Sequence, residues 1–127
     1  MPQGYSIASA FSYDLDCSVG VPKVMDETFD IVDRKDAIKR YKKTGYIAKL
    51  DNLYLLFVKE SSYDAPNYDR LTKALKELRK KCKKDCVKKL AMPKICTGAG
   101  GFDWEIVEDA ITDEFSLVDI DIVIYCR

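Results

Sequence analysis

The sequence predicts a single α/β domain in which helices cover both faces of a mixed β-sheet, giving three layers (α/β/α). Short apolar runs typical of strands alternate with longer segments in which apolar residues recur at helical spacing. One run, residues 53–58, is apolar on both faces, as in a strand covered on both sides. The length of 127 residues suits one compact domain, so residues 1–127 are expected to share one core.

The chain is expected to open with a strand followed by two helices. Residues 5–11 form a short run with small side chains, as in a buried strand. After a polar loop, Pro22 marks the first turn of a helix, where its missing amide does no harm. A second helix is expected over residues 33–43, with Ala37, Ile38 and Tyr41 on one apolar face and Gly45 at its end.

A hairpin and the clearest helix of the chain follow. Two β-rich runs, residues 46–50 and 53–58, flank Asp51 and Asn52, which is a hairpin signal. Asn67 can cap a helix that extends to about residue 84. The apolar residues of that segment fall at helical spacing: Leu71, Ala74, Leu75, Leu78 and Cys82.

The last third of the chain alternates again between strand and helix. Residues 87–92 read as a strand that ends at Pro93, and residues 95–101 form a glycine-rich loop. A helix is expected from Phe102 or Asp103 to about residue 115. Residues 119–126 alternate between isoleucine and other side chains, as in a final strand.

The charge balance argues against nucleic acid or a membrane as partner. Basic and acidic residues number 21 each, so no overall field favours an anionic polymer. Ten lysines and arginines gather in residues 70–89, against Glu77 and Asp85 alone. No aromatic residue interleaves with these charges, so a solvated helix face is favoured over a nucleic-acid surface.

The titratable residues limit the chemistry that is open to the protein. The five cysteines occur at spacings that match no zinc or redox motif, and the sequence contains no histidine. This composition indicates reduced thiols and predicts neither a metal site nor a cofactor. Cys82 and Cys86 could share a helix face, although buried thiols are favoured over a metal pair. Any reaction must therefore use carboxylates, lysine, backbone dipoles or water. No signal peptide or apolar span is recognisable, which predicts an intracellular protein of the nucleus or cytoplasm.

Three loops are expected to build the binding site. In open α/β sheets, ligands lie beyond the carboxyl ends of the strands, and residues 12–21, 59–66 and 94–104 occupy such positions. The third loop contains Gly98, Gly100 and Gly101, so its backbone amides can point into one concavity beside a helix N-terminus. A diphosphate would suit this arrangement, although the glycines alone are equally compatible with a tight turn.

The order of these segments carries a resemblance to a known family. Five segments follow one another at the spacing seen in that family. They are residues 53–59, the sequence Ala65-Pro66-Asn67-Tyr68, the helix through Cys82, residues 90–95 and Phe102-Asp103-Trp104. Together with residues 8–29, this set resembles the macro domain of the terminal ADP-ribose protein glycohydrolase, or O-acyl-ADP-ribose deacylase. The resemblance covers nearly the whole chain. It implies a macro domain that binds ADP-ribose or ADP-ribosylated protein.

The resemblance also implies roles for particular residues. The family's ribose-contacting serine falls on Ser12 and its catalytic lysine on Lys59, which in the family attacks the anomeric carbon of the distal ribose. A partly desolvated lysine after an apolar strand has a lowered pKa and is more nucleophilic, which favours this role for Lys59. The ligand-contacting set that the resemblance implies is Ser12, Ser18, Val19, Gly20, Val21, Thr97, Gly98, Ala99, Gly100, Gly101 and Phe102.

Three departures from the family leave the activity open. The family's loop aspartate, which completes the hydrolysis, aligns with Gly100; Asp103 is a weak substitute because helix capping is the commoner role at its position. The family's usual first strand, which carries an acidic residue for adenine, has no counterpart here. Val19 stands where a glycine would allow the diphosphate to approach closely.

Three functions therefore compete. The chain is a reader of ADP-ribose, or an enzyme that uses Lys59 to remove ADP-ribose from acidic side chains or to deacylate O-acetyl-ADP-ribose. The third alternative is a catalytically inactive module used for protein interaction. In that case a sheet edge exposed by the missing strand would serve a homodimer or strand addition.

Overall fold

The computed structural model describes residues 4–17, 20–41, 46–61, 63–97 and 101–125. The predicted order of strands and helices is confirmed, with some boundaries shifted by one to three residues. The elements are β1 (Ser6–Ser12), α1 (Gly20–Phe29), a 3-10 turn (Val32–Arg34), α2 (Lys35–Tyr41), β2 (Ile47–Leu50), β3 (Leu53–Lys59), α3 (Tyr68–Lys84), β4 (Lys89–Met92), α4 (Trp104–Phe115) and β5 (Asp121–Ile124).

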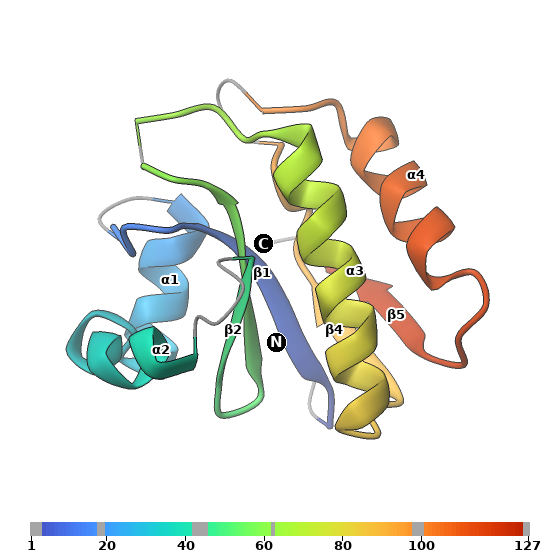
Figure 1. The fold of residues 1–127 in the computed structure, drawn as a ribbon, viewed down its shortest axis with the longest axis horizontal. Coiled ribbons are helices and arrows are strands. Elements are labelled where there is room, and N and C mark those ends of the chain that lie inside the picture. Colours follow the sequence, from blue (N-terminus) through green and yellow to red (C-terminus); the bar gives the residue numbers. More distant parts are fainter. Residues whose placement is uncertain (1–3, 18–19, 42–45, 62, 98–100, 126–127) are drawn as a thin grey trace.

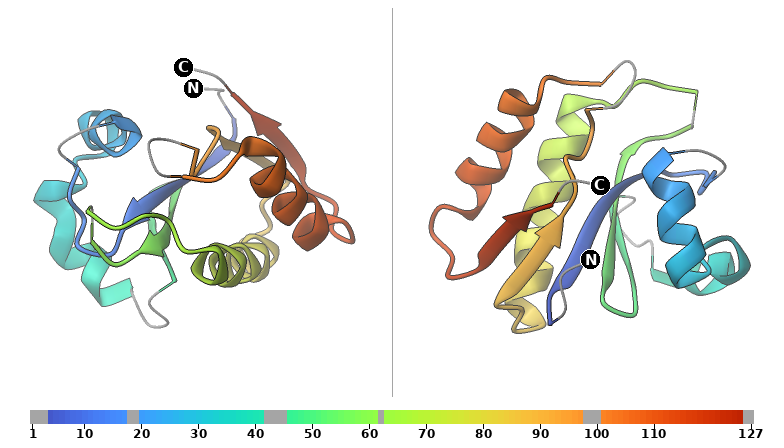
Figure 2. Two further views of the ribbon diagram at one scale, coloured as in Figure 1. Left: turned by 90° about the horizontal axis from the view of Figure 1, so that it is seen from above. Right: turned by 180° about the vertical axis from the view of Figure 1, so that it is seen from behind.

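The strands form one mixed sheet in the order β2-β3-β1-β4-β5. Strand β2 is antiparallel to β3, whereas β3, β1, β4 and β5 run parallel to one another. Helices α3 and α4 cover one face, and α1 and α2 cover the other, so the predicted three layers are confirmed (Figures 1 and 2). Among the described residues β5 pairs only with β4, which makes it one edge of the sheet.

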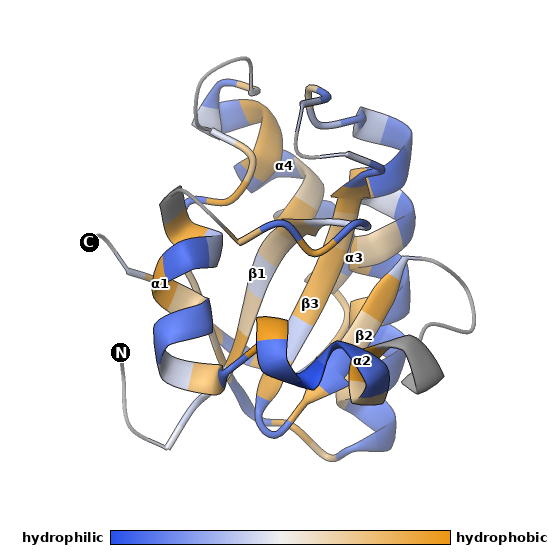
Figure 3. Ribbon diagram, turned by 90° about the vertical axis from the view of Figure 1, so that its left-hand side faces the viewer, coloured by the Kyte–Doolittle hydropathy of each residue, from blue (hydrophilic) through white to orange (hydrophobic). Residues whose placement is uncertain are grey.

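Two apolar clusters hold the layers together. One joins the sheet to α1 and α2 through residues such as Phe11, Met25 and Ile38, and the other joins it to α3 and α4. Residues 53–58 of β3 are at most 2 % exposed, which confirms a strand covered on both faces. Figure 3 shows the apolar colouring concentrated on the strands and the inward sides of the helices.

Helix α3 matches its sequence pattern closely. The Asn67 side chain accepts a hydrogen bond of 3.0 Å from the Arg70 amide, so it caps the helix as expected. All five predicted apolar positions of the helix are buried. Several of its basic side chains pair with acids, including Lys73 with Asp69 and Arg79 with Glu114, both at 2.9 Å. Within the described segments, no helix has the length and apolar character needed to cross a membrane.

The predicted second helix needs correction. A 3-10 turn precedes α2, so residues 33–43 are not one continuous α-helix, and the expected end at Gly45 lies outside the described residues. Ala37 is exposed whereas Ile38 is buried. The two side chains point about 100° apart around the helix, and in α2 the Ile38 side faces the core while the Ala37 side faces solvent. Cys86 likewise lies beyond the end of α3, is exposed, and does not share a helix face with the buried Cys82.

A charged cluster at the end of α3 ties this helix to the sheet. The Asp85 carboxylate accepts hydrogen bonds from the Tyr54 hydroxyl at 2.7 Å and the Lys49 ammonium at 3.1 Å, and it pairs with Lys81 at 3.3 Å. Burial alone would raise the pKa of Asp85, but these three donors outweigh it and hold the pKa below its ordinary value. The Tyr54 side chain is fully buried, so Asp85 also satisfies its hydroxyl.

Replacing Asp85 with asparagine is expected to lower the free energy of unfolding by about 1–2 kcal/mol at neutral pH. Because the folded-state pKa is depressed, the stabilisation is present above the unfolded pKa of about 3.9 and is lost as the pH falls through the folded value. Urea unfolding of both proteins at pH 7 and pH 3 measures this. Asp113→Asn, at an exposed position on α4, is the control and should change stability by less than about 0.5 kcal/mol. Equal stability of Asp85→Asn and the unmodified chain at pH 7 would contradict the account.

Candidate functional site

A cavity of about 430 Å³ lies at the carboxyl ends of β1, β3 and β4. This volume falls in the range of roughly 300–1,000 Å³ typical of small-molecule sites. The three predicted loops contribute to its wall, and Figure 1 shows them gathered at one end of the sheet. Much of the wall is apolar, with contributions from Phe11, Val58 and Ile95. The cavity therefore lies where loops were expected to converge.

The structure brings together five of the residues selected from the sequence. The cavity is lined by Ser12, Val21, Lys59, Thr97 and Gly101. Gly20 begins α1, next to Val21. Five other selected residues lie outside the described residues: Ser18, Val19, Gly98, Ala99 and Gly100.

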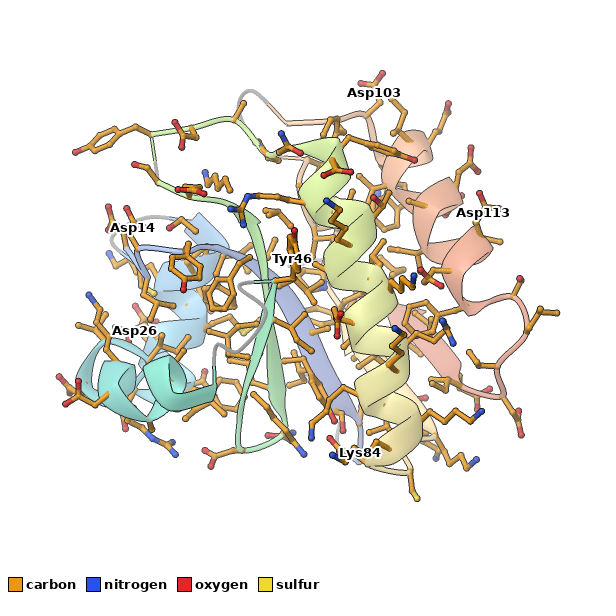
Figure 4. The ribbon with its side chains drawn as sticks, viewed as in Figure 1. Asp14, Asp26, Tyr46, Lys84, Asp103 and Asp113 are labelled. Carbon is orange, nitrogen blue, oxygen red and sulfur yellow. The ribbon has the colours of Figure 1, made fainter. Side chains whose placement is uncertain are left out.

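Phe102 and Asp103 are not among the residues that line the cavity. The Phe102 amide donates a 2.7 Å hydrogen bond to the Cys96 carbonyl, and its ring packs edge-on against Tyr68 with centroids 5.8 Å apart. Asp103 occupies the N-cap position of α4, but its side chain makes no capping hydrogen bond, so the expected capping role is wrong. Its exposed carboxylate points away from the body of the molecule (Figure 4). It is open to solvent there and makes no hydrogen bond with the helix amides.

Lys59 and Ser12 are paired across the two central parallel strands. The register advances from Phe11 opposite Phe57 to Ser12 opposite Lys59, so β3 contains one extra residue at this point. Such bulges re-aim side chains beside functional sites. Beyond the bulge, the Tyr13 amide donates to the Lys59 carbonyl at 2.8 Å, which keeps the two chains side by side as they leave the sheet.

Ser12 is held by the loop that follows it. Its hydroxyl donates a short hydrogen bond to the Asp14 carboxylate, and the same carboxylate oxygen accepts from the Asp16 amide at 3.2 Å. Since the hydroxyl proton is directed at Asp14, the Ser12 oxygen retains lone pairs that can accept a hydrogen bond. A ligand hydroxyl group in the cavity would suit this acceptor.

Cys96 lies beside Lys59 in the wall. Burial raises the pKa of the Cys96 thiol to about 12, and the positive charge of Lys59 opposes that rise only in part. The thiol therefore remains protonated at neutral pH and is a poor nucleophile. Its backbone has a φ of 60°, an unusual conformation for a residue other than glycine, at the turn that leads into the glycine-rich loop.

Sequence reasoning missed four polar residues of the wall: Ser9, Asp16, Lys94 and Cys96. Asp16 and Lys94 lie inside two of the predicted loops, so loop membership alone was the available signal. Ser9 is 1 % exposed, and its hydroxyl has no hydrogen-bond partner among the described residues. A buried hydroxyl without a partner destabilises a fold by about 1–3 kcal/mol, so a ligand or water that fills the cavity can restore this bond.

The first turn of α1 also faces the cavity, through Val21 and Pro22. First-turn amides have no acceptor within their own helix, and the helix dipole is positive at this end. The described wall contains two lysines, Lys59 and Lys94, against one carboxylate, Asp16, so it offers a surplus of positive charge together with hydroxyl groups. This combination suits an anionic ligand rich in hydroxyl groups. Among the described residues, no three histidine, cysteine or acidic side chains are grouped as metal ligands.

Comparison with known proteins supports one family. Residues 55–111 match the Macro domain. The chain is 30% identical over 128 residues to the ADP-ribose glycohydrolase OARD1 of Homo sapiens, covering 98% of this chain and 83% of that protein. The same protein from Bos taurus matches to the same extent.

Solved structures share the fold at lower sequence identity. The macrodomain of Thermus aquaticus DarG has a TM-score of 0.77 at 17% identity, covering 94% of this chain and 87% of that chain. Thermosipho africanus DarTG in complex with ADP-ribose has a TM-score of 0.77 at 18% identity, covering 95% of this chain and 37% of that chain.

Proposed function

The chain belongs to the macro domain family, and from this membership we propose that it binds ADP-ribose, free or attached to protein, in the cavity above β1, β3 and β4. The observation that carries the proposal is the convergence of Ser12, Val21, Lys59 and Thr97, from separate segments, on one cavity of about 430 Å³. Those positions are the ones that the family resemblance assigns to the ligand.

The distal ribose and the diphosphate of the ligand each have a partner of suitable chemistry. The Ser12 oxygen accepts a hydrogen bond from a hydroxyl of the distal ribose, because its own proton is directed at Asp14. The diphosphate lies against the first turn of α1, with Thr97 and Gly101 on the same wall, where the Val21 amide and the helix dipole favour an anion. The apolar wall accommodates the faces of the sugar rings and excludes water from these polar contacts.

Isothermal titration calorimetry with ADP-ribose tests binding directly. We expect one site per chain and a dissociation constant in the micromolar range, about −8 kcal/mol. ADP is the comparison ligand, because it lacks the distal ribose that Ser12 contacts and should bind more weakly. Absence of both heat and a thermal shift at millimolar ADP-ribose would overturn the proposal and favour the interaction module, which would use the β5 edge of the sheet.

A second function is favoured by the position of Lys59. This residue lies at the end of a strand that is buried on both faces, it lines the cavity, and it is opposite Ser12 in the sheet. Once its ammonium group has lost a proton to solvent, the Lys59 amine can attack the anomeric carbon of the distal ribose, so that a C–N bond forms and the C–O bond to a glutamate side chain breaks. The glutamate leaves as a carboxylate, with the electron pair of the broken bond. We propose that the chain hydrolyses ADP-ribosyl-glutamate, or O-acetyl-ADP-ribose with the acetyl group on the anomeric oxygen, in this way. This is in line with the glycohydrolase activity in the name of its relative OARD1.

A further inference from the structure

We propose that Asp16 is the carboxylate that activates water for the release of ADP-ribose from Lys59. The inference rests on the proposed hydrolase function and supplies its missing component. A lysine nucleophile alone leaves the sugar covalently attached, so turnover needs a base that deprotonates the attacking water.

Asp16 is the only carboxylate among the described residues that line the cavity. The other ionisable groups of that wall are the ammonium groups of Lys59 and Lys94 and the thiol of Cys96. Cys96 is protonated, and ammonium groups cannot accept a proton. Among the described residues of this wall, Asp16 is thus the side chain whose carboxylate can accept a proton from water. The exposed Asp103, selected from the sequence for this role, contributes nothing to the described wall.

The loop around Asp16 is built to hold it there. Its amide donates to the Asp14 carboxylate, which also accepts from Ser12. The residues on either side, Leu15 and Cys17, are both buried in the cluster under α1. Side chains that flank a residue and are buried against the core anchor its backbone. Asp16, between two such residues, is half-buried and lines the cavity.

Leu15 adds a conformational constraint. It has a φ of 56° and is only 2 % exposed. A left-handed backbone at leucine is unfavourable by about 1 kcal/mol or more and persists only where the surroundings hold it. Here the buried leucine side chain holds it, one residue before the point at which Asp16 lines the cavity.

A water oxygen forms a bond to the anomeric carbon while the C–N bond to Lys59 breaks, and that electron pair returns to the lysine nitrogen. One water proton passes to the Asp16 carboxylate. The products are ADP-ribose, the neutral lysine amine and a protonated Asp16, which then loses its proton to the released glutamate carboxylate or to solvent. The net reaction is ester plus water giving acid plus ADP-ribose.

Asp16→Asn tests the assignment with a peptide that carries ADP-ribosyl-glutamate. The expected result is a fall in kcat of about 100-fold, because loss of a general base typically reduces a rate by 10²–10⁴-fold. Glutamate release should still show a first-turnover burst. Borohydride should trap more Lys59 adduct than in the unmodified chain, because it reduces the open-chain imine that is in equilibrium with the ring-closed adduct. Azide should restore turnover, because it attacks the anomeric carbon without losing a proton.

Asp36→Asn, at an exposed position on α2, is the matched control and should retain full turnover. Full turnover by Asp16→Asn, or loss of turnover that azide does not restore, would overturn the role of Asp16. Calorimetry on the same proteins separates the two proposals. If the unmodified chain binds ADP-ribose but shows no turnover, the proposed hydrolase activity and the role of Asp16 are both wrong, whereas the proposed binding function is retained. If it does not bind, both proposals fail.

Discussion

Replacing Lys59 with alanine is expected to reduce turnover of ADP-ribosyl-glutamate by at least about 1,000-fold, because removal of a covalent nucleophile has effects of this size or larger. Binding of ADP-ribose should weaken by no more than about tenfold, since the hydroxyl and backbone contacts of the cavity remain. The measurement is single-turnover release of glutamate, combined with calorimetry on the same protein. Borohydride should trap no adduct in this variant.

Lys59→Arg is the matched control for the charge of this side chain. Arginine keeps a positive charge in the cavity, but it stays protonated and cannot act as the amine nucleophile. We therefore expect Lys59→Arg to bind ADP-ribose like the unmodified chain and to be as inactive as Lys59→Ala. Substantial turnover by either variant would show that Lys59 acts only through its charge, or not at all.

Ala10→Phe is expected to weaken ADP-ribose binding by about 1,000-fold, which moves a micromolar complex to the millimolar range. Ala10 lies in β1, where it lines the cavity beside Ser9 and Phe11. A phenylalanine there is compatible with a β-strand and places its ring in the space that the ligand needs. Calorimetry measures the loss, and far-UV circular dichroism checks that the fold is retained.

The exposed Ala37 on α2 provides the comparison for this substitution. Ala37→Phe adds the same side chain outside the cavity, so ADP-ribose affinity should be unchanged. Retention of micromolar affinity by Ala10→Phe, with the fold intact, would show that the ligand lies elsewhere on the molecule.

Local rules account for most of the fold. Asn67 followed by apolar residues at helical spacing predicts α3 and its capping bond, because both depend on residues close together in the chain. The run of six apolar residues in β3 predicts a strand covered on both faces for the same reason. The general position of the site also follows, since ligands in such sheets lie beyond the carboxyl ends of the strands.

The finer features of the site depend on contacts between distant segments. The pairing of Ser12 with Lys59 requires a bulge between strands that are separated by about 40 residues in the sequence, and no local pattern marks it. Asp16, which lines the cavity, directly follows Leu15. The left-handed backbone of Leu15 is held by burial and is a conformation that leucine rarely favours on its own. The prediction that Asp103 caps α4 was wrong. Its position in the sequence places it next to the helix amides but does not fix the direction of its side chain.

A crystal structure of the chain with ADP-ribose tests the central claim most directly. It should place the diphosphate against the first turn of α1, a distal ribose hydroxyl within hydrogen-bond distance of the Ser12 oxygen, and the anomeric carbon beside Lys59. A smaller groove, formed in part by Tyr68 and Glu114, lies between α3 and α4. The claim would be contradicted if ADP-ribose were bound in that groove and not in the main cavity.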